Sequence, residues 1–178
     1  MKPLFISAII ALTLLACHDQ STPASEAKTA SSSTDMKAVY EKNLATLKAA
    51  VAAFEKEDVE QFASNYADSA KFHPPVYGMP DGGKKDLKNY VSAFFANWDS
   101  IKLVQSNFLP GLDSATHEMD GSARYYGVWS AVNKNGYKGK VKVYEAFDFN
   151  KDNKIIDVDG YYDAGGVMNA VNNFANKK

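Results

Sequence analysis

The chain holds a single cysteine, Cys17, among its 178 residues, so it can form no intrachain disulfide. It also lacks an excess of positive charge, because 20 Lys and Arg residues stand against 21 Asp and Glu residues. Proteins that bind nucleic acid through phosphate contacts usually carry a basic excess, so we expect no nucleic-acid partner. The apolar stretch at residues 4–15 is shorter than the roughly 20 residues that span a bilayer. Length and apolar content together predict one domain with a hydrophobic core.

The N-terminal segment has the pattern of a targeting signal. Lys2 precedes the apolar stretch, which has the size of a signal-peptide core and ends in the sequence LLAC at residues 14–17. This ending resembles the lipobox of bacterial lipoproteins, in which a small residue precedes a cysteine that becomes lipidated. The resemblance implies that residues 1–16 are removed and that Cys17 carries lipid. The alternative is a secretory signal with an incidental cysteine.

The segment after the cysteine predicts a flexible tether. Residues 17–35 are rich in Ser and Thr and contain no aromatic residue, so they cannot bury enough apolar area to offset the entropy of ordering. By resemblance to bacterial sorting rules, the non-acidic His18 favours the outer membrane, on its periplasmic side, over the inner membrane. Residues 36–178 are then expected to form the folded domain.

Helices are expected in the first half of this domain. One apolar stripe steps by four and three residues, which is typical of an amphipathic helix: Tyr40, Leu44, Leu47, Val51 and Phe54. Asp58 is a candidate N-cap for a short second helix through Phe62 and Tyr66, with Gln61 in capping-box position. A third helix begins near Lys84 and carries a broad aromatic face that must pack against something large, most simply a sheet.

Strands are expected in the second half. Four segments, 101–109, 122–132, 140–149 and 154–163, are separated by short turns, which indicates an antiparallel meander. A last short helix opens at Gly165 and Gly166. The predicted fold class is therefore α+β, with the helices on one face of the sheet.

Five stretches in this order resemble a known superfamily. They are FEKEDVEQF at 54–62, YADSAKF at 66–72, GKKDLKNY at 83–90, DFNKDNKII at 148–156 and YYD at 161–163. Together they resemble the nuclear-transport-factor-2-like superfamily, most closely its branch of SnoaL-like polyketide cyclases and ketosteroid isomerases. The resemblance implies a cone-like curved antiparallel sheet with N-terminal helices packed on its concave face. It also implies a pocket for small, largely apolar ligands, in which some members use an Asp, Glu or His as general acid or base.

The last strand tests the resemblance to the enzymes. In the cyclases the catalytic acid stands three residues before the closing Asp of this strand, and that position is Gly160 here. Asp157 and Asp159 fall on the opposite face, because side chains alternate along a strand. A bulge at Gly160 would re-aim Asp159 inward, and without one the chain departs from the cyclase pattern.

Two side chains remain as candidate catalytic residues. Glu145 shares a strand face with apolar residues, so burial in a pocket would raise its pKa and suit it to acid–base work, unless it instead pairs with a neighbouring cation. His73 precedes two prolines in a region that rims the pocket of relatives, and it is either a proton shuttle or a structural histidine.

Candidate ligand-binding residues are the aromatic side chains of the third helix and the strands, together with the chain's one arginine: Tyr90, Phe94, Trp98, Arg124, Tyr125, Trp129 and Tyr162. Arg124 would clamp a ligand carboxylate or form an ordinary cross-strand contact. The aromatics would stack on a ligand or fill the core. We expect no cofactor and no metal, because the sequence shows no classical metal cluster or nucleotide loop. The calcium-loop-like residues 148–159 lack the turn glycine and the closing Glu, so they predict a hairpin turn.

Three functions follow as hypotheses. The first is a lipid-anchored envelope protein that binds a small apolar or aromatic molecule without catalysis. The second is an isomerase, dehydratase or cyclase with Glu145 or His73 as acid or base. The third is an interaction module that forms a homodimer through the outer face of the sheet, where Tyr144 and Tyr161 would lie.

Overall fold

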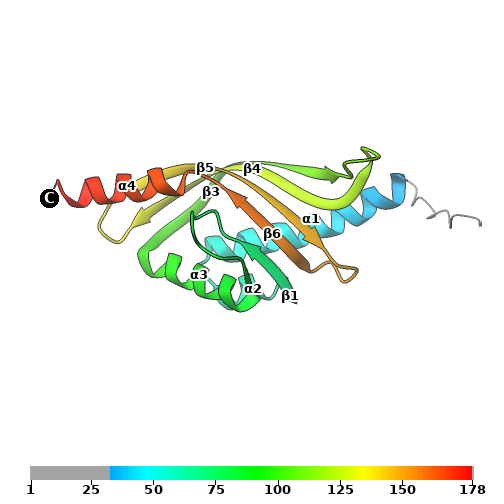
Figure 1. Ribbon diagram of the computed structural model, residues 1–178, viewed down its shortest axis with the longest axis horizontal. Helices are drawn as coiled ribbons and strands as arrows, with labels where there is room; N and C mark the ends of the chain where they lie inside the picture. Colours follow the sequence, from blue (N-terminus) through cyan, green and yellow to red (C-terminus); the bar gives the residue numbers. More distant parts are fainter. Residues whose placement is uncertain (1–32, 178) are drawn as a thin grey trace, which may run out of the picture. The chain divides into compact units, whose positions relative to one another are not determined.

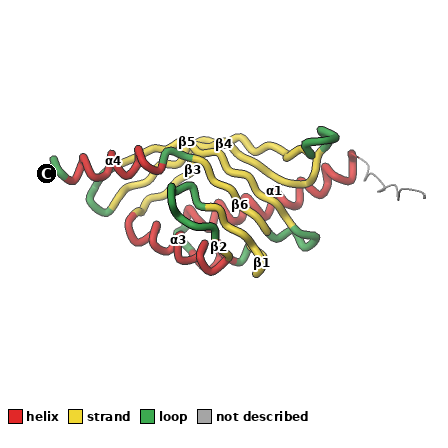
Figure 2. Tube along the Cα trace, viewed as in Figure 1, coloured by secondary structure: helices red, strands yellow, loops and turns green. Residues whose placement is uncertain are grey.

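The computed structural model describes residues 33–177, with side chains from Asp35 onward. The signal segment, Cys17 and nearly all of the expected tether therefore lie outside the described residues. The helices are α1 (Ser33–Glu55), α2 (Val59–Ala63), α3 (Lys84–Asn97) and α4 (Ala164–Ala175). The strands are β1 (Tyr66–His73), β2 (Gly82–Gly83), β3 (Trp98–Leu112), β4 (Met119–Asn133), β5 (Lys138–Phe149) and β6 (Ile155–Tyr161) (Figures 1 and 2). Within the described part, no helix is long and apolar enough to cross a bilayer.

One six-stranded sheet organises the domain, in the order β2-β1-β6-β5-β4-β3. The four long strands β3 to β6 form the predicted antiparallel meander, and β3 is 15 residues long. In Figure 1 the helices α1, α2 and α3 lie on one side of this sheet. The α+β fold class predicted from the sequence is confirmed.

The first strand differs from the sequence prediction. Tyr66, expected in the second helix, is instead the first residue of β1, and α2 ends at Ala63. The reason is a tertiary contact: β1 pairs in parallel with β6, which lies some 90 residues later in the chain (Tyr66 beside Ile155). Tyr66 is buried by this pairing, with only 3% of its surface exposed. A local pattern cannot indicate a partner so distant in sequence.

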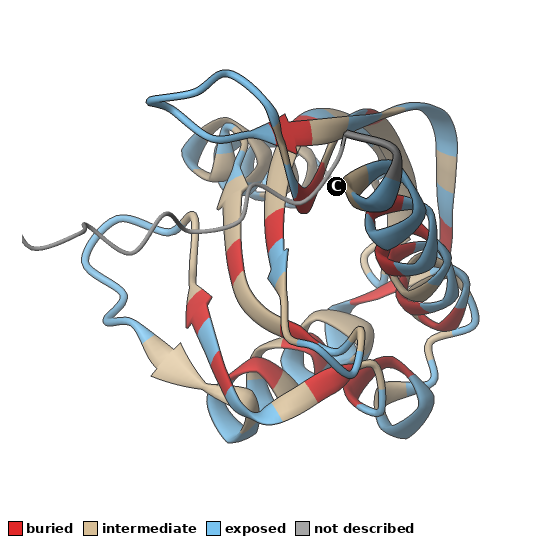
Figure 3. Ribbon diagram, turned by 90° about the vertical axis from the view of Figure 1, so that its right-hand side faces the viewer, coloured by how far each residue is buried: buried red, intermediate tan, exposed pale blue. Residues whose placement is uncertain are grey.

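The apolar stripe of α1 faces the sheet as predicted. Tyr40, Leu44 and Leu47 are buried, and Phe54 packs against the same core. Figure 3 shows buried residues recurring along the strands and helices, between exposed ones. The buried set includes Val143 and Phe147 of β5, which alternate with residues of the opposite face.

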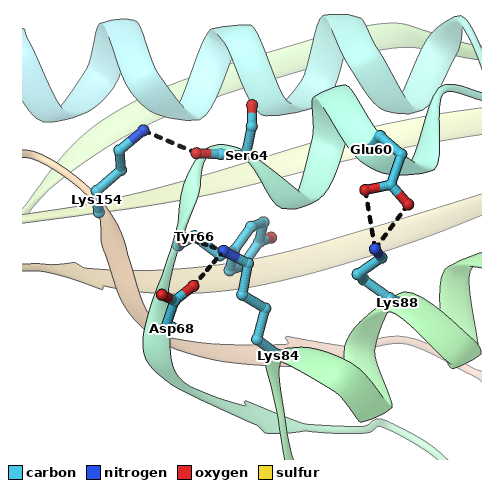
Figure 4. Close-up of polar contacts among 7 residues, drawn as sticks. All are labelled: Glu60, Ser64, Tyr66, Asp68, Lys84, Lys88 and Lys154. Atoms are coloured by element: carbon cyan, nitrogen blue, oxygen red, sulfur yellow. Dashed lines mark hydrogen bonds and ion pairs between the residues drawn. The ribbon is translucent and has the colours of Figure 1, made fainter.

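Two lysine side chains connect α3 to β1 and to α2 through hydrogen bonds and ion pairs (Figure 4). Lys84 at the start of α3 donates to the Tyr66 carbonyl at 2.8 Å and to Asp68 at 2.9 Å. Lys88 of α3 binds both oxygens of Glu60 in α2, at 2.7 and 2.9 Å. Exposed ion pairs contribute little stability each. Their effect here is positional, because they fix α3 against β1 and α2.

A buried amide joins α1 to the start of β4 and to the turn between β5 and β6. The Asn43 side chain donates to the Gly121 carbonyl at 2.8 Å and accepts from the Asn153 amide at 2.6 Å. Both partner residues have positive φ, +85° at Gly121 and +57° at Asn153. Asn43 is 3% exposed, so these bonds satisfy polar atoms that water does not reach.

The C-terminal helix α4 is attached differently from the others. None of its residues is buried, although Asp163 caps its N-terminus by accepting from the Gly166 amide at 2.7 Å. Its side chains meet the β4–β5 turn, where the Phe174 ring lies 5.8 Å from the ring of Tyr137. In Figure 1 it extends to the end of the domain farthest from the start of α1.

Candidate functional site

A cavity of about 180 Å³ lies between the inner face of the sheet and helices α1 and α3. Its lining is mostly aromatic and aliphatic, with few polar groups. Six of the seven predicted ligand-binding residues contribute to it: Tyr90, Phe94, Trp98, Tyr125, Trp129 and Tyr162. Such a cavity suits a small, largely apolar ligand that is oriented by a few hydrogen bonds.

Glu145 is the one carboxylate in this lining. It sits on the inner face of β5 between Val143 and Phe147, because residues 143, 145 and 147 share a face of the strand. Protein atoms enclose it, and the surface that it retains faces the cavity. Burial raises the pKa of Glu145 to about 6, although a hydrogen bond from Tyr125 opposes the rise. The group therefore changes protonation state close to neutral pH.

A short hydrogen-bond chain orients this carboxyl group. The Tyr125 hydroxyl donates to Glu145 Oε2 at 2.6 Å, and the Trp129 indole N–H donates to the Tyr125 hydroxyl at 2.9 Å. Tyr125 is 1% exposed, and it pairs directly with Glu145 across the β4–β5 ladder. Burial and the neighbouring carboxylate hold the pKa of Tyr125 well above its usual value, so it stays a neutral donor.

Two further tyrosines form a second polar group in the cavity. The hydroxyls of Tyr90 in α3 and Tyr162 after β6 lie 2.9 Å apart. Burial raises the pKa of Tyr90, and each hydroxyl is also affected by the charge of Glu145. Because two hydroxyls share one hydrogen bond, one O–H remains able to donate to a ligand.

Gly160 lies directly opposite Glu145. The two residues pair across the β5–β6 ladder, and β5 and β6 stay in register from Tyr161 to Asp157 without a bulge. A Cβ atom at residue 160 would lie 3.6 Å from Glu145 Oε1. The cavity therefore has no side chain where the resemblance placed an acid. A carboxyl group reaches the same space from the neighbouring strand.

Two predicted site residues lie outside the cavity lining. His73 is at the end of β1, where its Nδ1 lies 2.9 Å from Asp81 and its Nε2 lies 3.3 Å from Asp157. Arg124 lies on the outer face of β4, because its neighbour Tyr125 points inward. Its charge acts on Asp148 of the adjacent strand. The structure thus places neither His73 nor Arg124 with the cavity residues, which corrects their sequence-based grouping with the pocket.

Other lining residues were not singled out from the sequence. Tyr66 and Phe72 of β1 and Pro75 of the following loop all contribute to the cavity. The pKa of Tyr66 is raised well above its usual value, chiefly by burial and also by the charge of Glu145. The sequence does contain a signal that could have indicated this strand: Ala70 and Phe72 alternate with polar residues, which is typical of a half-buried strand.

Metal binding finds no support in the described part of the chain, where no group of three or more His, Cys, Asp or Glu side chains could hold an ion. The calcium-loop-like segment is a turn between β5 and β6. The Asn150 side chain there accepts from the backbone amides of Asp152 and Lys154, both at 2.9 Å.

Solved structures with this fold are numerous at low sequence identity. A proposed polyketide cyclase from Xanthomonas campestris pv. campestris is 15% identical, with a TM-score of 0.61 over 75% of this chain and 98% of its own. The pinacolase BvnE from Penicillium brevicompactum is 13% identical, with a TM-score of 0.62 over 79% of this chain and 99% of its own. A proposed isomerase from Bacillus subtilis is 16% identical, with a TM-score of 0.59 over 75% and 95%. These likenesses establish the fold.

Sequence comparison gives the family directly. No curated protein matches the chain significantly. The family model for SnoaL-like domains matches residues 47–158, which include the C-terminal part of α1, all of α2 and α3, and the strands up to Val158 in β6. This is more than half of the chain, and the chain therefore belongs to the family of SnoaL-like domains.

Proposed function

We propose that this protein binds a small, uncharged and mostly apolar molecule in the cavity, and that Glu145 holds its polar group. The observation that carries the proposal is the arrangement of the carboxyl group. Tyr125 holds Glu145 Oε2, while Oε1 is directed toward the space beside Gly160. An apolar cavity of about 150 Å³ accepts one benzene ring in other proteins. A cavity of about 180 Å³ therefore suits a small ligand of one ring or two fused rings.

Binding can be tested with indole and 4-hydroxyacetophenone as probes, followed by amide NMR shifts of the folded domain. We expect shifts at Tyr90, Tyr125 and Glu145 and saturable binding. Val141→Trp, which places a large side chain in the lining, should abolish those shifts. Val128→Trp, on the opposite face of the sheet, is the matched control. Absence of shifts with both probes at millimolar concentration would contradict the proposal.

A second candidate is acid–base catalysis by the same carboxyl group. Its pKa of about 6 suits a group that accepts and returns a proton near neutral pH. The Tyr90 and Tyr162 hydroxyls are neutral donors in the same cavity, and a donor of this kind stabilises the oxyanion that forms when a proton leaves a carbon beside a carbonyl. The solved neighbours include a pinacolase and proposed cyclases and isomerases.

Catalysis would require Glu145 itself. With a one-ring ketone as substrate, Glu145→Gln should lower kcat by about 10²–10⁴-fold and leave KM nearly unchanged. Asp159→Asn removes a carboxylate from the opposite face of β6 and should have no such effect. An unchanged kcat in Glu145→Gln would exclude Glu145 as the base. Binding of both probes without turnover would favour the first candidate.

We further propose that the mature protein is held in the bacterial envelope by lipid on Cys17. The LLAC sequence and the Ser- and Thr-rich segment after it support this proposal. Cys17→Ser should move the protein from the membrane fraction to the soluble fraction and prevent incorporation of labelled fatty acid. Membrane retention of that variant would contradict it.

Self-association is the third proposal. Tyr126, Tyr144 and Tyr161 pair in register across β4, β5 and β6 on the outer face, with ring centroids 4.8 and 5.9 Å apart. Tyr126 and Tyr161 are 54% and 58% exposed. We propose that a second copy of the chain covers this tyrosine row.

A further inference from the structure

His73 joins three segments that are separate in the sequence. It ends β1, its Nδ1 lies 2.9 Å from Asp81 just before β2, and its Nε2 lies 3.3 Å from Asp157 of β6. The imidazole ring therefore stands between two carboxylates, one on each side. Only the doubly protonated ring can donate to both of them at once.

The loop between β1 and β2, residues 74–81, forms part of the cavity wall. Pro75 is a lining residue, and its Cδ lies 3.8 Å from the position that a Cβ of residue 160 would take. Pro75 is thus next to the space that Glu145 Oε1 faces. Displacement of this loop would open the cavity beside the carboxyl group.

The rest of the loop is held by few contacts. Its tip is a turn closed by the Met79 amide and the Val76 carbonyl at 3.0 Å, with Gly78 at a φ of +77°. Tyr77 is fully exposed, and Val76 and Met79 are exposed as well. The backbone pairing between β1 and the two-residue β2 ends at Phe72 and Gly82. The next contact between the two sides of the loop, one residue closer to its tip, is that of His73 with Asp81.

We propose that the His73 imidazolium is a latch that holds the β1–β2 loop against the cavity. Loss of its proton breaks the link between Asp81 and Asp157, and the loop then opens the cavity beside Glu145. The latch itself does not depend on the ligand. Its role in retaining a ligand rests on the proposed binding function.

The charges around His73 set the direction of this pH dependence. Asp81 faces the ring from the loop, and Asp157 and Asp159 face it from β6. Lys71, two residues earlier on β1, is exposed on the same face of the strand. The hydrogen bond with Asp81 and the nearby carboxylates raise the pKa of His73 above its usual 6.5, although partial burial opposes the rise.

A raised histidine pKa means that the latch is complete at low pH and is lost as the pH rises through the pKa of the folded state. Glu145 has a pKa of about 6, so its neutral carboxyl group and the closed loop coexist in acidic solution.

The direct test uses the folded protein without ligand. Amide hydrogen exchange of residues 76–79 and 81–83, corrected for the intrinsic pH dependence, is measured from pH 5 to pH 9 beside an NMR titration of the His73 ring. We expect protection to fall by about tenfold or more, with a midpoint at the measured His73 pKa. His73→Asn should exchange fast at every pH, and Asp157→Asn should lower the midpoint.

Two controls make the test decisive. Glu145→Gln should leave the midpoint unchanged, because Glu145 does not contact the latch. Should His73→Asn fail to fold, Asp81→Asn removes the same link from an exposed position. Equal protection of the loop in wild type and Asp81→Asn at pH 5.5 would overturn the latch, as would a flat pH profile of the wild type.

A second measurement separates the latch from the proposed binding function. Dissociation of indole, measured by NMR exchange, should accelerate with pH in the wild type and be fast at all pH values in His73→Asn. If indole fails to bind while loop protection still titrates, the latch stands and the binding proposal fails. If indole binds but its dissociation is independent of His73, the latch does not control the cavity.

Discussion

At the scale of single residues, Glu145 combines two opposed influences. Enclosure by protein atoms favours its neutral form, while the Tyr125 hydroxyl favours its charged form. Because enclosure is the larger influence, the net pKa is about 6 rather than 4.5. The same carboxyl group can thus be a donor at pH 5 and an acceptor at pH 8, and this change is the basis of the first two predictions.

Glu145→Gln should make stability less dependent on pH. A carboxyl group with a raised folded-state pKa stabilises the protein at low pH, and that contribution is lost as the pH rises from 4.5 to about 6. The difference is about 2 kcal/mol, at 1.36 kcal/mol for each pKa unit. Urea unfolding at pH 4.5 and pH 8 should show Glu145→Gln gaining stability relative to wild type at the higher pH. A constant difference between the two proteins would contradict the shifted pKa.

Tyr125→Phe should raise the pKa of Glu145 above 6, because the lost hydrogen bond is the influence that lowers it. It also leaves the Trp129 indole N–H without its acceptor, at a cost of about 1–3 kcal/mol. Carbon NMR titration of the Glu145 carboxyl and urea unfolding measure the two effects. Tyr126→Phe, on the outer face, is the matched control and should change neither.

At the scale of elements, Asn43 is the residue through which α1 contacts the start of β4 and the β5–β6 turn. Asn43→Leu should destabilise the fold by about 1–3 kcal/mol, because the Gly121 carbonyl and the Asn153 amide lose a buried partner. Thermal or urea unfolding measures the loss. Asn89→Leu, on the exposed side of α3, should cost far less. Similar losses in the two variants would show that the buried amide has no special role.

The long elements were predictable because each satisfies its pattern locally. The apolar stripe of α1 repeats every 3.6 residues, and each turn between β3, β4, β5 and β6 joins strands that are neighbours in the sequence. Both patterns can be recognised from residues that lie close together in the chain. The start of β1 was not predictable in this way. Its pairing with β6 is parallel and joins residues some 90 positions apart, so residues 64–66 are interpreted from the local sequence as a continuation of a helix.

The candidate site was predictable to the extent that strand alternation determines it. Alternation predicted that Glu145 shares a face with the apolar residues of its strand, and that Asp157 and Asp159 lie on the face opposite Gly160. In the structure Glu145 and Gly160 line the cavity, and Asp157 contacts His73. Alternation could not place His73, because the orientation of a side chain at a strand end depends on the following loop. Its partner Asp81 follows a loop that contains three prolines and a tight turn, and Asp157 comes from another strand.

At the scale of the whole molecule, the outer face of β5 has opposite charges at its two ends. Lys138, Lys140 and Lys142 occupy one end, Tyr144 the middle and Asp148 the other end. Asp157 and Asp159 of β6 add to the acidic end. A two-fold axis near Tyr144 would bring the basic end of one copy against the acidic end of the other, as an isologous interface requires.

Tyr144→Lys and Tyr161→Lys should therefore convert the proposed dimer to a monomer. Each places a cation in the tyrosine row, and sedimentation equilibrium of residues 36–178 measures the result. Tyr77→Lys, in the exposed β1–β2 loop, is the matched control and should leave the dimer intact. Raising the salt concentration from 50 to about 500 mM should weaken association by screening the paired charges. A wild-type domain that is monomeric at high concentration would contradict the dimer.

The pairing of Glu145 with Gly160 has a consequence for how such proteins diverge. Two positions that face each other across a ladder reach the same space, so an acid can pass from one strand to the other through an intermediate that holds both. A relative with an acid at the position of Gly160 would therefore hold its carboxyl group in the space that Glu145 Oε1 faces in this protein.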